Sequence, residues 1–202
     1  MLIKNIFSKV WQSVYCFFSA IAVNFWWPVW SNLRFKNAER SDILVTDEDT
    51  VYSIGEIKML ICRIYKKFNY TADDASQLWD AITPPPQNYK NYLAGKVSDD
   101  CDGFHSTVYH CLHRSGIPCF LLSVIAPKAS HCLLAFKFKG KWYILDYTQV
   151  YDGYFRLADA IKAYNKVFVK KYNSKYNVLY NGLTEFNYNT GKFKSQSIKR
   201  IN

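Results

Sequence analysis

The chain has 202 residues, of which 50% are hydrophobic and 18% are aromatic, and its formal net charge is +10. This length and composition suffice for one domain with a hydrophobic core plus an extension, and they exclude a chain that is disordered over most of its length. Six cysteines without CxxC spacing, in a chain of this size, indicate free thiols in a reducing compartment, not a disulfide framework or a structural zinc site.

Residues 1–36 stand apart because residues 10–30 carry no charge, whereas Lys and Arg lie on both sides. Three interpretations compete: a transmembrane helix, a signal peptide cleaved near residues 20–22, and an amphipathic helix. Four polar side chains fall within a sector of about 60° on a helical wheel, opposite the apolar ones, namely Asn5, Ser8, Gln12 and Ser19. An amphipathic helix is therefore preferred. Its apolar face would rest on a membrane surface, on a partner or on its own domain, and the tryptophans around Pro28 would form an aromatic connector.

The next segments alternate between loops and helices. Residues 37–50 are polar and predict a loop, whereas apolar residues at helical spacing predict a helix over 53–68. Thr71 followed by Asp74 is typical of the start of a short helix, which would contain Leu78 and Trp79 and end at the prolines 84–86. Residues 87–99 predict a polar loop.

From Cys101 onward the pattern predicts a helix that ends at Gly116, a residue suited to a helix C-cap. Apolar runs over 117–125, 131–138 and 142–147 predict three strands, the last two forming a hairpin. A short helix is expected over 156–164 and a turn over 189–191.

Cys101 has the surroundings of a reactive thiol. It follows two aspartates that can cap a helix, so it should lie in the first helical turn. There the positive end of the helix stabilises a thiolate and lowers the pKa from its usual value of about 8.5. The backbone N–H of a first-turn residue can also stabilise an oxyanion.

The predicted hairpin supplies two partners for this thiol. If Lys139 and Gly140 form a two-residue loop, Leu133 lies opposite Asp146. His131 and Asp146 are then diagonal neighbours on one face of the sheet and within side-chain reach, whereas another loop length would reverse the faces. A thiol, an imidazole and a carboxylate in this order are the components of a cysteine nucleophile, its base and the group that orients the base.

The motifs around these residues resemble those of the transglutaminase-like superfamily, and in particular the bacterial transglutaminase-like cysteine proteinases. "SDDCDGFHSTVYHCLHRSGIP" is similar to the cysteine motif, "SHCLLAF" to the histidine motif and "GKWYILDYT" to the aspartate motif. "LWDAITPP" echoes an upstream segment of the family, and the resemblance covers about residues 65–165. It implies a papain-like fold in which Cys101 is the nucleophile, His131 the general base and acid, and Asp146 its orienter.

Two properties of that family stay open. Some members bind calcium through acids beside the cysteine, and Asp100 and Asp102 match those positions. Helix capping explains Asp100 equally well, so we assign no metal and no cofactor. A second oxyanion donor would come from Trp79, Gln87 or Tyr92, and the sequence does not choose among them.

Other reactive side chains give weaker signals. His105 lies four residues after Cys101, which is the spacing of a metal-binding pair, but no second cluster completes a site. His110 and His113 lie on the same helix, and Cys111, Cys119 and Cys132 lie on apolar segments typical of the core. Residues 161–202 hold nine Lys or Arg and one acid, a charge of +8. A solvated basic surface is favoured there over nucleic-acid binding, because no recognition motif accompanies the charge.

The sequence therefore predicts an α+β, papain-like core in which a cysteine-bearing helix packs on an antiparallel sheet, preceded by an amphipathic helix. Residues 1–36 would form the extension and residues 37–202 the domain. The expected function is a cysteine-dependent hydrolase or acyl transferase that acts on peptide or side-chain amides through a thioester. The alternative is a structural or binding protein of a viral particle or membrane-associated assembly. Partners would be a protein or peptide substrate and, through residues 1–36, a membrane surface or protein. A cytoplasmic or virion-associated location in a phage or bacterial system is favoured.

Overall fold

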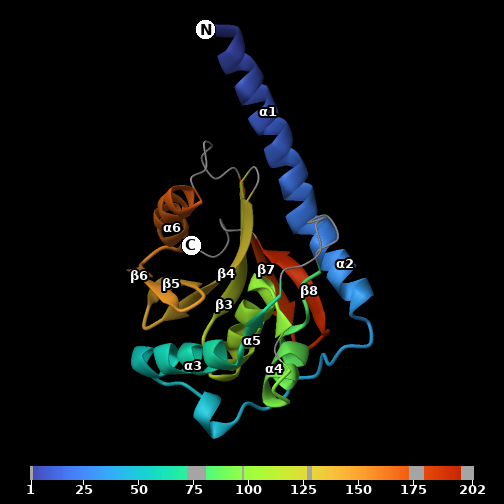
Figure 1. Cartoon of the computed structure of the whole chain (residues 1–202), viewed down its shortest axis with the longest axis vertical. Coiled ribbons are helices and arrows are strands. Elements are labelled where there is room, and N and C mark those ends of the chain that lie inside the picture. Colours follow the sequence, from blue (N-terminus) through green and yellow to red (C-terminus); the bar gives the residue numbers. More distant parts are fainter. Residues whose placement is uncertain (1, 72–80, 97, 127–128, 173–179, 197–202) are drawn as a thin grey trace.

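A six-stranded antiparallel sheet with strand order β6-β5-β4-β3-β7-β8 forms the centre of the molecule (Figure 1). The computed structural model describes residues 2–71, 81–96, 98–126, 129–172 and 180–196, with the backbone alone for residues 2–9, 98 and 129. The strands are β3 (Cys119–Ala126), β4 (Ala129–Phe138), β5 (Lys141–Asp146), β6 (Gln149–Tyr154), β7 (Tyr180–Asn187) and β8 (Lys192–Gln196). A separate parallel pair joins β1 (Asn69–Tyr70) to β2 (Ser98–Asp99).

Helices cover both faces of the sheet. Leu121 faces a core that contains apolar residues of α3 (Ile54–Lys67), α4 (Pro85–Leu93) and α5 (Cys101–Arg114). Its neighbour Leu122 faces a second core, formed with α6 (Leu157–Lys171). Because successive strand residues point to opposite faces, these cores lie on either side of one sheet. The predicted α+β core, with the cysteine-bearing helix α5 packed on an antiparallel sheet, is confirmed.

The hairpin of β4 and β5 has the predicted register. Lys139 and Gly140 have φ values of 47° and 79° and form the two-residue loop. Phe138 pairs with Lys141, and the pairing continues to Leu134 opposite Leu145. A two-residue loop with positive φ matches the right-handed twist of the strands, so the loop sets which residues of the two strands lie opposite each other. At the other end of α5, Gly116 has a φ of 72° and follows the helix as predicted.

Three predicted segments differ from the structure. Residues 87–99 are not one polar loop, because α4 occupies residues 85–93; Pro85 and Pro86 begin this helix, where no backbone N–H is required. Helix α6 continues to Lys171 instead of ending at residue 164, since Phe168 extends its buried face. The tail forms the β7–β8 hairpin around the predicted turn. The short helix expected around Leu78 and Trp79 lies outside the described residues.

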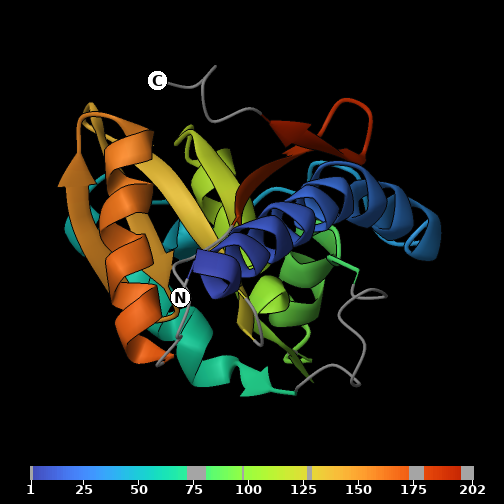
Figure 2. The same ribbon diagram turned by 90° about the horizontal axis from the view of Figure 1, so that it is seen from above.

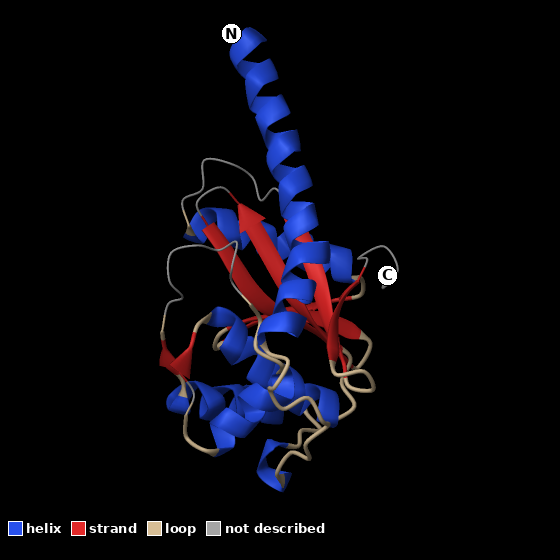
Figure 3. Ribbon diagram, turned by 90° about the vertical axis from the view of Figure 1, so that its right-hand side faces the viewer, coloured by secondary structure: helices blue, strands red, loops and turns tan. Residues whose placement is uncertain are grey.

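The N-terminal segment is helical throughout. It comprises α1 (Leu2–Ile21), a π-helical turn η1 (Ala22–Trp26) and α2 (Trp27–Arg34), so the predicted aromatic connector is itself helical, with Pro28 in the first turn of α2. α1 projects away from the sheet, and its N-terminus lies at the far end (Figure 3). Seen from above, α2 and α6 lie toward opposite ends of the sheet (Figure 2). Within the described part of the chain, none of the helices combines the length and the apolar character needed to cross a membrane.

One close backbone contact fixes the N-terminal helices on the sheet. Val23 in η1 is fully buried and lies over Gly182 in β7. A Cβ at Gly182 would lie 2.2 Å from a methyl carbon of Val23, so only glycine allows η1 to approach the strand this closely.

Candidate active site

Cys101 is the first residue of α5 and is half-buried. The helix begins here because the Asp100 carboxylate accepts a hydrogen bond from the backbone N–H of Asp102 at 3.0 Å. Phe104 and Val108 anchor the helix in the core. The backbone N–H of Cys132 donates to Cys101 Sγ at 3.3 Å, which places the sulfur beside the residue that follows His131. The sulfur thus lies at the positive end of a helix and receives an N–H donor, and both features favour a thiolate.

His131 and Asp146 form the hydrogen bond that the hairpin register predicts. His131 Nε2 lies 2.9 Å from Asp146 Oδ1, and both side chains are buried. Because an ionised carboxylate only accepts, Nε2 carries the proton, which leaves Nδ1 as the basic nitrogen of a neutral imidazole. The predicted contact is confirmed. That Nδ1 faces Cys101 stays a prediction.

Helix α6 contributes two further partners of Asp146. Its Oδ2 accepts from the hydroxyl of Tyr164 at 2.9 Å and from Lys171 Nζ at 2.8 Å. Neither residue was among the site residues predicted from the sequence. Their spacing of seven residues puts them on one face of a helix, and this signal could have indicated a shared partner. With three donors, the carboxylate is held in one orientation.

The charges at this position are coupled. Burial alone would raise the pKa of Asp146, but the hydrogen bonds from His131 and Lys171 outweigh it and hold the pKa well below its usual range. Burial lowers the pKa of Lys171, and the Asp146 carboxylate more than compensates, so that this pKa is raised. The pair is therefore a carboxylate and an ammonium at neutral pH. A permanent negative charge therefore lies beside His131.

His105 is a buried, neutral residue that contacts the backbone of Cys101. Its Nδ1 donates to the Cys101 carbonyl at 2.6 Å, and its Nε2 accepts the backbone N–H of Tyr147 at 3.1 Å. Complete burial, together with the neighbouring His131, lowers the pKa of His105 to about 3. Tyr147 has a φ of 48°, an uncommon value for a non-glycine residue, and its ring contacts the rings of both His105 and His131. His105 thus connects the Cys101 turn to the turn after Asp146, and a role as a metal ligand does not fit its two hydrogen bonds.

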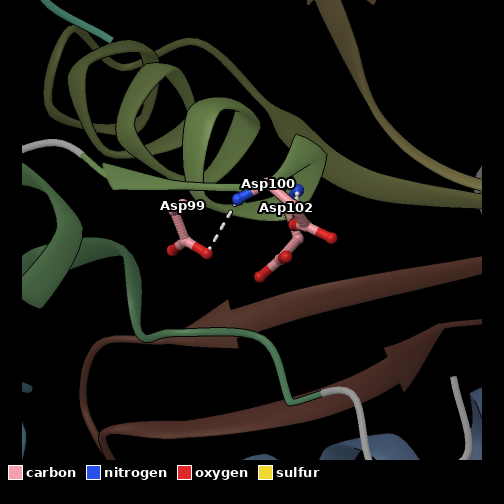
Figure 4. Close-up of side chains that lie close together, drawn as sticks. All are labelled: Asp99, Asp100 and Asp102. Atoms are coloured by element: carbon pink, nitrogen blue, oxygen red, sulfur yellow. Dashed lines mark hydrogen bonds between the residues drawn. The ribbon is translucent and has the colours of Figure 1, made fainter. Parts of the chain in front are cut away.

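Three aspartates surround the start of α5 (Figure 4). Carboxylate oxygens of Asp99, Asp100 and Asp102 lie within 4.8 Å of one another, and oxygen ligands of this kind suit calcium. Asp99 accepts the backbone N–H of Asp100 at 2.9 Å and lies against Gly103, where a Cβ would overlap its side chain. Capping of the helix accounts for Asp99 and Asp100, and we assign no metal to the cluster.

The candidates for a second oxyanion donor are not resolved. Trp79 lies outside the described residues. Gln87 accepts from the backbone N–H of Glu39 at 2.8 Å and donates to Asn91 at 2.9 Å, and Tyr92 is buried in the core. Gln87 and Tyr92 therefore have structural contacts that explain their positions.

The remaining cysteines and histidines have distinct surroundings. Cys111 and Cys119 are buried as predicted, and burial raises the pKa of both thiols. Cys132 was expected in the core but is half-buried, and its backbone N–H donates to Cys101 Sγ. Cys62 is exposed. His110 donates from Nε2 to the Ile43 carbonyl at 2.8 Å and is buried.

Comparison with known proteins gives little beyond this geometry. No family model matches the chain, and no curated protein matches it. A solved structure from Cytophaga hutchinsonii, titled a "Putative Cysteine Protease", has 16% identical residues and a TM-score of 0.37. That match covers 48% of this chain and 32% of the other, so it spans about a third of that protein. An assignment of activity therefore depends on the side chains of this chain's own site.

Proposed function

We propose that the chain is a cysteine-dependent hydrolase or acyl transferase that acts on peptide or side-chain amides, with its chemistry in residues 37–202. The contact that carries the proposal is the buried bond from His131 to Asp146, with the Cys101 sulfur beside the next residue of the same strand. Cys101 would be the nucleophile, His131 the base and Asp146 the orienting group. The motifs that resemble transglutaminase-like cysteine proteinases support the same roles.

The proposed reaction has two steps. His131 takes the thiol proton, and the Cys101 thiolate attacks the amide carbonyl carbon. A C–S bond forms, and the carbonyl electrons move to an oxyanion near the first turn of α5. The oxyanion collapses, the C–N bond breaks, and His131 gives its proton to the leaving amine. Water or a second amine then attacks the thioester, loses a proton to His131 and releases Cys101 as its thiol.

The test of this proposal is amide turnover by the purified full chain. Incubated with a quenched-fluorescence peptide library and with glutamine peptides plus a primary amine, the chain should release or exchange amine from a subset of substrates. Cys101→Ala should lower that turnover by at least about 10³-fold, because no second nucleophile replaces the thiol. Cys62→Ala is the matched control, since this cysteine is exposed and belongs to another helix. Turnover that survives in Cys101→Ala would refute the assignment.

The second candidate, a binding or structural protein on the same scaffold, draws on the exposed apolar side chains of the N-terminal helices. It predicts no turnover that depends on Cys101. The same experiment therefore separates the two candidates, provided that Cys101 reactivity is measured in parallel.

A further inference from the structure

The N-terminal helices carry a row of exposed apolar side chains. We define the apolar stripe as the six apolar residues from position 14 onward in α1, η1 and α2 that are 43–63% exposed, namely Val14, Phe17, Phe18, Ile21, Phe25 and Leu33. They follow one another at helical intervals along one side of the segment. Contiguous apolar surface of this kind marks an interaction site more often than scattered single residues do.

The opposite side of the same segment faces the domain and carries polar side chains together with the buried Val23. Tyr15 donates to the Ala126 carbonyl at 3.3 Å, and Ser195 donates to Asn24 at 2.7 Å. Asn32 accepts the backbone N–H of Phe193 at 3.0 Å, and Ser31 accepts that of Ile82 at 2.9 Å. An amphipathic helix on a water-soluble domain normally turns its whole apolar side inward, whereas here the apolar stripe stays exposed. The part of the domain that the structure describes does not cover the stripe.

Charge indicates the chemistry of the partner. Residues 1–36 contain two Lys before the stripe and Arg34 and Lys36 at its end, and they contain no acid. If a second copy of the chain packed on the stripe, the four basic residues of one segment would repel the four of the other. An anionic surface would instead attract these basic residues. Apolar and aromatic side chains flanked by basic residues are the composition of helices that lie in the headgroup region of anionic bilayers.

We propose that the apolar stripe docks on an anionic lipid bilayer, with α1, η1 and α2 lying along its surface. The hydrogen bonds of Tyr15, Asn24 and Asn32 hold the domain on the opposite side of the segment. The contact of Tyr15 with Ala126 lies at the end of β3, next to the strand that carries His131. Docking would thus hold the candidate active site near the membrane surface. The inference does not depend on the chemistry proposed for Cys101.

The experiment is flotation of the full chain with vesicles of phosphatidylcholine, alone and mixed with phosphatidylserine. The chain should float with the mixed vesicles. For the double variant, Phe17→Ser with Phe25→Ser, the affinity for these vesicles should fall about tenfold for each phenylalanine removed. Phe155→Ser is the matched control, because this phenylalanine is 81% exposed but belongs to the segment after β6. It should bind like the wild type.

A second arm tests the charge. Lys9→Gln and Lys36→Gln should each weaken binding to the mixed vesicles by about fivefold, which corresponds to about 1 kcal/mol for each basic residue near an anionic surface. Three results would overturn the proposal: no flotation of the wild type, equal flotation of the double variant, or a wild-type dimer in light scattering that becomes a monomer in the double variant. The last result would assign the stripe to a second copy of the chain.

Discussion

Replacing Asp146 with asparagine is expected to slow amide turnover by about 10³–10⁴-fold and alkylation of Cys101 at pH 6 by about tenfold. The carboxylate accepts from His131, Tyr164 and Lys171, so it fixes which imidazole nitrogen carries the proton. An asparagine amide offers one oxygen for these three donors, and its NH₂ would face a donor if it turned toward His131. The basic nitrogen would then no longer be held for the thiol.

The measurement is the second-order rate constant of iodoacetamide with Cys101 in each variant, read by peptide mass spectrometry. Asp152→Asn makes the same chemical change at an exposed position in β6 and should leave the rate unchanged. Tyr164→Phe and Lys171→Gln each remove one donor but keep the carboxylate, so they should slow alkylation less, by about threefold or under. A rate for Asp146→Asn within about twofold of the wild type would remove Asp146 from the proposed mechanism.

The fold should lose several kcal/mol of unfolding free energy between pH 6.5 and about pH 4.5, because two of its histidines are buried as neutral residues. Burial lowers the pKa of His105 to about 3 and that of His110 to about 4, from an ordinary value of 6.5. In this window the unfolded chain binds protons that the folded chain does not, so stability falls as pH falls. Each histidine contributes up to about 1.4 kcal/mol per pH unit until its folded pKa is reached.

Hydrogen bonding and burial explain why neither histidine accepts a second proton in the fold. His105 Nε2 accepts the backbone N–H of Tyr147, and a proton on this nitrogen would break that bond. For His110, burial is the main reason why the charged form is disfavoured. Urea unfolding at pH 7, 6 and 5 measures the slope. In His110→Gln, the fall of the unfolding free energy per pH unit should be about half that of the wild type. Asp146 does not contribute in this range: its pKa is lowered in the fold, so its stabilising contribution is lost only below its unfolded pKa of 3.8. A flat profile between pH 7 and pH 5 would contradict the account.

The sequence predicted those parts of the site that depend on short-range rules. A two-residue loop at Lys139 and Gly140 sets the register of its hairpin, so the contact of His131 with Asp146 follows from counting. The start of α5 at Cys101 likewise follows from the local chemistry of Asp100.

What the sequence did not predict depends on how elements pack. Lys171 follows Asp146 by 25 residues and reaches it only because α6 crosses the β5–β6 end of the sheet. Periodicity showed that the N-terminal helix has a polar and an apolar side, but it could not show which side the domain binds. The prolines at 84–86 were expected to end a helix that lies outside the described residues. In the structure Pro85 begins the next helix, α4, because the first turn of a helix does not need the backbone N–H that proline lacks.

The central claim, that Cys101 is an activated nucleophile, is tested most directly by the order in which iodoacetamide alkylates the cysteines of the full chain at pH 6. We predict that Cys101 reacts at least about tenfold faster than Cys62, although Cys62 is the more exposed thiol, and that His131→Ala abolishes this difference. Cys111 and Cys119 should react last, because both are buried. Alkylation of Cys101 no faster than Cys62, or no faster than the buried pair, would contradict the claim.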